Sequence, residues 1–109
     1  MTRHRFTIGF AVFVILALIG TPLLAADGAA LYKTKCFACH GEKGNGDTVM
    51  GKKLGVRNLG SADVQKQTDA VLTGIIANGK QKMPAYAGKL ADPDIKALVA
   101  TIRTFAPAK

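Results

Sequence analysis

The segment that most constrains this chain is Cys36-Phe37-Ala38-Cys39-His40, in which two residues separate the cysteines and a histidine follows at once. This spacing is the attachment signature of a c-type haem. A helical turn of this length separates the two thiols by the distance between the two vinyl groups at the haem edge, so each sulfur can form a thioether bond. His40 then lies under the iron as its first axial ligand. The segment therefore predicts one haem, covalently bound through Cys36 and Cys39.

Three other uses of such a cysteine pair fit the rest of the chain less well. Thiol redox chemistry belongs beside a βαβ pattern, and no strand pattern flanks these cysteines. A structural zinc site needs four ligands, but the chain has no further cysteine, and its other histidine, His4, lies in a segment predicted to be removed. A disulfide across so short a loop adds little stability. Haem attachment is therefore the preferred interpretation.

Residues 1–26 have the order of a secretory signal peptide. The basic cluster Arg3-His4-Arg5 precedes an uncharged, apolar run from Phe6 to Ala26, which ends in small residues. We expect cleavage after Ala26, with Ala25 the close alternative, so that residues 27–109 form one exported domain in the periplasm. The apolar run is also long enough to act as an uncleaved membrane anchor, and membrane association is expected only in that case.

The exported part carries helical signals and no strand pattern. We expect a first helix from about Gly28 through Ala38, and a glycine-rich loop from Gly41 to Gly60 that wraps over the cofactor. Capping residues and apolar spacing predict three later helices. These are Ala62–Gln67 after Ser61, Asp69–Asn78 after Thr68 with Val71, Leu72, Ile75 and Ile76 on its buried face, and a last helix from Asp92-Pro93-Asp94 to about Phe105. The last helix is expected to pack on the first.

Two methionines outside the signal segment are candidates for the second axial ligand, because a thioether sulfur is a soft ligand suited to haem iron. Met83 follows a predicted helix end and precedes Pro84, which holds a loop extended. Met50 lies in the glycine-rich loop. Met83 is the preferred ligand, while Met50 and an open sixth position remain alternatives.

The chain is strongly basic, with 15 Lys and Arg against 7 Asp and Glu and a formal net charge of +8. A basic exported domain indicates acidic protein partners or a negatively charged membrane surface, although the surplus of lysine also serves solubility. Aromatic residues are few and the compartment is wrong for nucleic acid, so no nucleic-acid partner is expected.

Together these motifs resemble a small, bacterial, monohaem class I cytochrome c. The resemblance covers nearly all of the exported part and rests on six segments: Gly28-x-x-Leu31-Tyr32, Cys36-x-x-Cys39-His40-Gly41, Gly44-x-Gly46, Ile75-Ile76-Ala77-Asn78-Gly79, Met83-Pro84-Ala85-Tyr86 and Ile95-x-x-Leu98-Val99. It implies an all-α fold of about four short helices around one haem, with the first and last helices crossing. It also implies His40 and Met83 as axial ligands, and one-electron transfer rather than catalysis.

The chain departs from the family pattern at one position. Family members usually carry an aromatic residue where this chain has Thr101. The crossing near Gly28 and Tyr32 is therefore expected to be packed differently, with help from Phe105.

The expected function is that of a monomeric carrier that passes electrons between redox proteins. Its docking surface is expected to be ringed by lysines and to face acidic partners; the candidates are Lys43, Lys80, Lys82 and Lys89. Two alternatives share the motifs. One is a haem enzyme or gas sensor with a labile sixth ligand, such as a small peroxidase. The other is a tethered cytochrome subunit of a dehydrogenase or oxidase complex.

Overall fold

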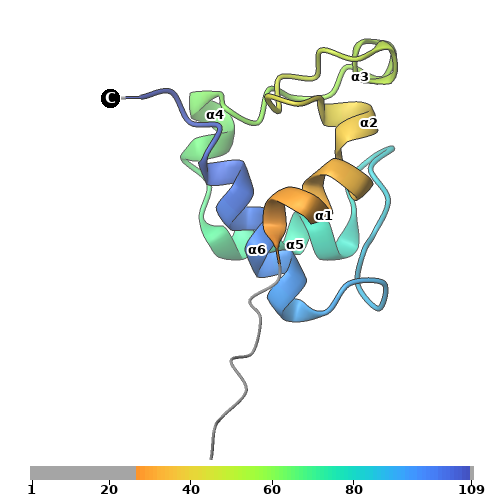
Figure 1. The fold of residues 1–109 in the computed structure, drawn as a ribbon, viewed down its shortest axis with the longest axis vertical. Coiled ribbons are helices and arrows are strands. Elements are labelled where there is room, and N and C mark those ends of the chain that lie inside the picture. The colour runs from red at the N-terminus through yellow and green to blue at the C-terminus, as the bar shows by residue number, and fades with distance from the viewer. Residues whose placement is uncertain (1–26, 109) are drawn as a thin grey trace, which may run out of the picture.

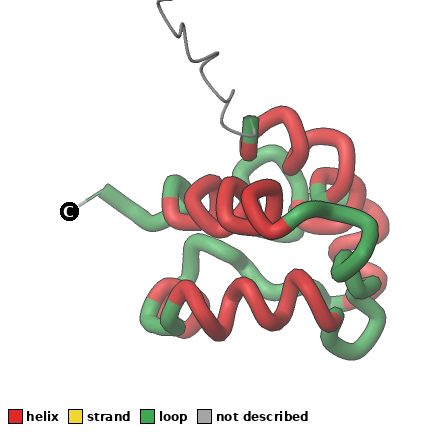
Figure 2. The backbone as a smooth tube through the Cα atoms, turned by 90° about the horizontal axis from the view of Figure 1, so that it is seen from below, coloured by secondary structure: helices red, strands yellow, loops and turns green. Residues whose placement is uncertain are grey.

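The computed structural model describes residues 27–108, and this part of the chain contains six helices and no strand. In chain order the helices are α1 (Gly28–Lys35), α2 (Phe37–His40), α3 (Val49–Leu54), α4 (Ala62–Gln65), α5 (Asp69–Asn78) and α6 (Asp92–Arg103) (Figure 1). Loops join them, as the tube in Figure 2 shows. The predicted all-α fold is confirmed, with six helices where about four were expected. The predicted signal peptide and its cleavage site lie outside the described residues.

The first expected helix, Gly28 through Ala38, is in fact two helices. The Asp27 carboxylate caps α1 by accepting a hydrogen bond of 3.2 Å from the Ala30 amide. Helix α1 then ends at Lys35, and the single turn α2 follows after Cys36. At the break, Cys36 has a φ of −117°, and the Cys39 amide donates to the carbonyl of Cys36, three residues back, at 3.3 Å. The predicted attachment segment, Cys36–His40, is therefore a separate helical turn rather than the end of α1.

The prediction of an irregular loop from Gly41 to Gly60 was wrong in its middle, where α3 forms. The Thr48 hydroxyl caps α3 by accepting a hydrogen bond of 2.8 Å from the Gly51 amide. Gly55 ends the helix with a φ of 63°, a left-handed conformation that favours glycine. The density of glycines hid a short helix that has a regular cap at each end.

Helices α1 and α6 cross closely at the centre of the molecule (Figure 1). A β-carbon on Gly28 would collide with the carbonyl oxygen of Ala97 and the hydroxyl of Thr101. Further along the crossing, the rings of Tyr32 and Phe105 pack with their centroids 5.1 Å apart. The expectation that Phe105 helps to pack the crossing beside Thr101 is therefore confirmed.

The buried core joins these two helices to α4 and α5. Its members are Tyr32, Val64, Leu72, Ile76, Ile95, Leu98, Val99 and Ile102. The bounds predicted for α5 are confirmed, but Val71, expected on its buried face, is 49% exposed. The face of α5 that packs inward is therefore narrower than its apolar pattern suggested.

The remaining boundaries differ from prediction by a few residues. Helix α4 ends at Gln65 rather than Gln67. Helix α6 ends at Arg103 rather than near Phe105, and Ala91, not Asp92, takes the cap position before it. The carboxylate of Asp94 accepts a hydrogen bond of 3.1 Å from the Ala91 amide, which satisfies one of the free donors at this helix start.

Arg103 links α6 to the end of α4, to the connection after it and to the start of α5. Its guanidinium donates to the carbonyl oxygen of Gln65 at 2.8 Å and to that of Gln67, and it pairs with Asp69 at 2.8 Å. Gln67 is thereby held in the wall of the cavity described below. No helix among residues 27–108 is both long and apolar enough to cross a membrane.

Candidate haem site

A cavity of about 520 Å³ lies between the helices, a size within the usual range of ligand pockets. It is lined by all four predicted site residues, Cys36, Cys39, His40 and Met83. The rest of the wall is largely apolar and includes Leu54, Val56, Leu59, Val64, Leu72, Ile75, Ile76, Leu98 and Ile102. Leu54, Val56 and Leu59 come from the glycine-rich segment that was expected to wrap over the cofactor. An apolar wall with a few donor groups suits a large flat cofactor.

Both cysteines are half-buried, and neither forms a disulfide within the described residues. Burial raises the pKa of the Cys36 thiol to about 11, with a smaller contribution from Cys39. Reactive redox cysteines have the opposite property, a lowered pKa that exposes a thiolate. No group of three or more potential metal-binding side chains lies in the described part of the chain. The geometry therefore gives no support to thiol redox chemistry or to structural zinc.

Three consecutive carbonyl groups at the end of α2 are each held by a different hydrogen-bond donor. The Thr48 hydroxyl donates to the carbonyl of Cys39 at 3.0 Å, and the Gly46 amide donates to that of His40 at 2.8 Å. The Tyr32 hydroxyl donates to the carbonyl of Gly41 at 2.7 Å. The carbonyls of Cys39 and His40 would otherwise be unsatisfied acceptors at a helix end, whereas that of Gly41 also accepts from the Gly44 amide at 3.2 Å. The backbone that presents His40 is therefore fixed from α1, α3 and the loop between α2 and α3.

His40 lines the cavity with its imidazole half-buried. Its Nδ1 is fully buried and has no hydrogen-bond partner within the described residues. Burial lowers the pKa of the imidazole, which favours the neutral form that binds metals. A buried ring nitrogen without a protein partner calls for an explanation, and metal ligation at this imidazole is one that suits its surroundings.

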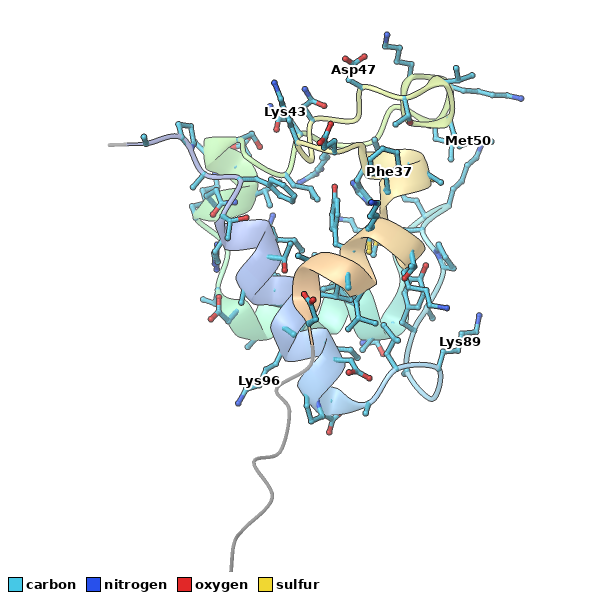
Figure 3. The ribbon with its side chains drawn as sticks, in the orientation of Figure 1. Phe37, Lys43, Asp47, Met50, Lys89 and Lys96 are labelled. Atoms are coloured by element: carbon cyan, nitrogen blue, oxygen red, sulfur yellow. The ribbon has the colours of Figure 1, made fainter. Side chains whose placement is uncertain are left out.

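Met83 and Met50, the two candidates for the second ligand, occupy different environments. Met83 is half-buried and lines the cavity. Met50 is 45% exposed, is not part of the lining and lies at the outer edge of the molecule on α3 (Figure 3). Of these two thioethers, only that of Met83 is brought together with His40 and the cysteines.

Two tyrosines in the cavity wall were not predicted as site residues. Tyr86 lines the cavity and donates its hydroxyl to the carbonyl of Lys35 at 3.0 Å. Burial raises the pKa of Tyr86, and the two cysteines add to the effect, so the hydroxyl keeps its proton. In the sequence, a role for Tyr86 at the site was indicated only by its position three residues after Met83. Tyr32, predicted to pack, also carries the hydrogen bond to Gly41.

The cationic side chains around the cavity differ from the set expected to ring it. Lys80 and Lys82 line the cavity, whereas Lys43 and Lys89 do not. Figure 3 shows the latter two on separate loops, with Lys43 in the segment after α2 and Lys89 in the segment before α6. Lys35 and Arg57 supply two further positive charges in the lining.

These residues fit a covalently bound haem. The cavity offers two thiols on one turn, a neutral imidazole with an unpartnered buried nitrogen, a thioether and an extensive apolar wall. The thiols are the groups that haem attachment requires, the imidazole and the thioether can ligate iron, and the apolar wall can bury the ring.

Comparison with known proteins points to one family. The family model described as cytochrome C oxidase, cbb3-type, subunit III matches residues 24–101. The chain is 31% identical over 107 residues to cytochrome c6 of Picosynechococcus sp., covering 92% of each protein. It is 33% identical over 104 residues to cytochrome c6 of Thermosynechococcus vestitus, covering 92% of this chain and 90% of the relative.

Two further matches extend this picture. The cbb3-type cytochrome c oxidase subunit CcoP of Azospirillum brasilense is 32% identical over 87 residues, but the match spans only 30% of that protein. Among solved structures, the KustC0563 c-type cytochrome superposes with a TM-score of 0.69 at 36% identity. That match covers 74% of this chain and 99% of the other.

Proposed function

Because the chain belongs to the cytochrome c family and is a small monohaem member of it, we propose that it carries single electrons between redox proteins. One observation supports this most strongly. Four donor groups from two distant segments, Cys36, Cys39 and His40 in one and Met83 in the other, line a single apolar cavity. When bound there, a c-type haem takes up and releases one electron.

The attachment segment has two tasks in this proposal. The thiols of Cys36 and Cys39 hold the cofactor through thioether bonds, and His40 ligates the iron with its neutral imidazole. The hydrogen bonds to the carbonyls of Cys39, His40 and Gly41 support this, because they fix the backbone on which these side chains stand. A rigid set of ligands suits electron transfer, since little has to move when the charge changes.

Met83 completes the ligand set in this proposal. A thioether opposite an imidazole favours the reduced state and raises the reduction potential. With both axial positions taken by side chains, no position is left for a substrate, which favours a carrier over an enzyme. The relatives named cytochrome c6 support the same choice.

We propose that partners approach a face made basic by Lys35, Arg57, Lys80 and Lys82, which surround the cavity. Attraction between opposite charges steers such encounters, and salt weakens this attraction. The order of the basic, apolar and small residues in 1–26 supports export and cleavage after Ala26, which would place residues 27–109 in the periplasm.

Two alternatives use the same cavity. A haem enzyme or gas sensor would need a labile sixth ligand, and a tethered subunit would need residues 1–26 to stay attached. The match to an oxidase subunit favours the second of these over the first.

The carrier proposal is tested by purifying the exported protein and following the haem. We expect the haem to stay with the chain when the protein is denatured and extracted with acidic solvent, because thioether bonds survive this treatment. We also expect the reduced protein not to bind carbon monoxide. Release of the haem would contradict covalent attachment, and ready binding of carbon monoxide would favour the enzyme or sensor.

A further inference from the structure

The segment that carries Met83 is attached to the rest of the molecule on two sides. On one side, the amides of Tyr86 and Ala87 donate to the carbonyls of Ile76 and Ala77, near the end of α5, at 3.0 and 2.9 Å. On the other side, the Tyr86 hydroxyl donates to the carbonyl of Lys35, 51 positions earlier in the chain, at 3.0 Å. Tyr86 thus joins the end of α5 to the end of α1.

The acceptor on α1 exists because the helix breaks at the attachment segment. In a continuous helix the amide of Cys39 would donate to the carbonyl of Lys35. Here it donates to Cys36 instead, and the Lys35 carbonyl is left for Tyr86. Lys35 directly precedes Cys36, so this hydrogen bond ties the Met83 segment to the attachment segment itself.

Residues 79–90 have few other means of holding their shape. They contain no helix. Backbone hydrogen bonds close two short turns: one between Lys80 and Met83, at 3.2 and 2.9 Å, and one from the amides of Lys89 and Leu90 to the carbonyl of Tyr86, both at 2.9 Å. Gln81 has a φ of 53°, an unfavourable left-handed conformation for a residue with a side chain. Among the described residues, the Tyr86 hydroxyl makes the only side-chain hydrogen bond from this segment to another part of the fold.

We propose that Tyr86 is the positioning residue for the second axial ligand, acting through the hydrogen bond from its hydroxyl to Lys35. By tying residues 79–90 to the attachment segment, this hydrogen bond keeps Met83 in the cavity and slows its replacement by an outside ligand. The inference rests on the proposed function, in which Met83 ligates the iron.

The test uses the haem-loaded, full-length protein and the variant Tyr86→Phe, which keeps the ring and removes the donor. The oxidised proteins are titrated with imidazole, and loss of the weak far-red methionine–iron band reports displacement of Met83. We expect imidazole to bind Tyr86→Phe about two- to tenfold more tightly than wild type, the range that one net hydrogen bond gives. We also expect the amides of Tyr86 and Ala87 to exchange faster by a similar factor, with α6 amides unchanged.

The control is Thr34→Val, which likewise removes one side-chain hydroxyl and its hydrogen bond to a backbone carbonyl. The Thr34 hydroxyl donates to the carbonyl of Leu31 within α1 at 3.1 Å, and Thr34 does not line the cavity. We expect its imidazole affinity to stay within about twofold of wild type. If imidazole bound both variants more tightly by the same factor, the role of Tyr86 would be overturned. The same would follow if Tyr86→Phe bound imidazole no more tightly than a wild type that shows the methionine–iron band. Neither result would contradict ligation by Met83. A wild type without the band would overturn ligation by Met83 and the inference with it.

Discussion

The hydroxyl of Tyr32 donates a hydrogen bond of 2.7 Å to the carbonyl oxygen of Gly41, the residue that follows His40. Tyr32 is buried, and its ring also packs against Phe105 from α6. One side chain therefore links the crossing of the first and last helices to the backbone of the proposed iron ligand.

Tyr32→Phe is expected to destabilise the haem-loaded protein by about 0.5–1.5 kcal/mol, because the carbonyl of Gly41 loses one of its two donors while the Gly44 amide and the ring packing remain. Denaturant unfolding measures this change. An unfolding free energy equal to that of wild type would mean that the hydrogen bond contributes nothing.

The same tyrosine predicts a dependence of stability on alkaline pH. Burial, helped by Cys36, raises the pKa of Tyr32 from 10.0 to about 12 in the folded chain. Between these values the folded state holds a proton that the unfolded state has lost. The stabilising contribution is therefore complete below about pH 10 and is lost as the pH rises toward 12. The free energy of unfolding should fall more steeply over this range in wild type than in Tyr32→Phe, and parallel curves would contradict the assignment.

Gly28→Ala is expected to destabilise the protein by about 1–3 kcal/mol, because the new methyl group would meet the carbonyl of Ala97 and the hydroxyl of Thr101. Gly74→Ala is the matched control, since Gly74 lies within α5 and has open space where its β-carbon would stand. Alanine there should stabilise the helix by about 0.5–1 kcal/mol. Thermal or denaturant unfolding of the two variants should shift in opposite directions, and shifts of the same sign would count against the crossing described.

Thr48 and Thr68 cap different helices, so their alanine variants separate capping from a second role. Each loses a cap worth about 1 kcal/mol. Thr48→Ala also removes the donor to the carbonyl of Cys39, so its total loss should be about 2 kcal/mol. Only Thr48→Ala should alter the haem spectrum. Identical effects of the two variants on stability and spectrum would show that α3 does not support the attachment segment.

The lysines of the cavity lining predict charge-dependent electron transfer. At low salt, Lys80→Glu and Lys82→Glu should each slow oxidation by the anion ferricyanide about threefold or more, because local positive charge attracts anions. Lys96→Glu is the control, since Lys96 projects from α6 outside the cavity lining (Figure 3). High salt should abolish the difference. Equal slowing by all three variants would indicate net charge alone rather than a basic docking face.

Much of the fold follows from local signals in the sequence. The span of α5 was predicted from the capping residue Thr68 and the apolar spacing after it, and the start of α6 was predicted to within one residue. Cys36, Cys39, His40 and Met83 were predicted as site residues because each lies in a short sequence motif that is typical of haem binding. These signals are local, and each could be interpreted without knowledge of the rest of the chain.

Other features depend on contacts between distant residues. The hydrogen bond from Tyr86 to Lys35 forms only when segments 51 positions apart meet. Helix α3 was not predicted because its glycines are typical of a loop, although Thr48 is a regular helix cap. Gly51 is needed there because a β-carbon would collide with the carbonyl oxygen of Cys39, which lies distant in the sequence. Val71 follows the apolar spacing of α5, yet no element of the described chain covers it fully.

The central claim is that Met83 rather than Met50 ligates the iron opposite His40. It is tested most directly by visible spectra of the oxidised, haem-loaded wild type and of the variants Met83→Ala and Met50→Ala. Wild type and Met50→Ala should show a low-spin spectrum with the weak far-red methionine–iron band, and Met83→Ala should lose that band. A band that survives in Met83→Ala, or disappears in Met50→Ala, would contradict the proposed site.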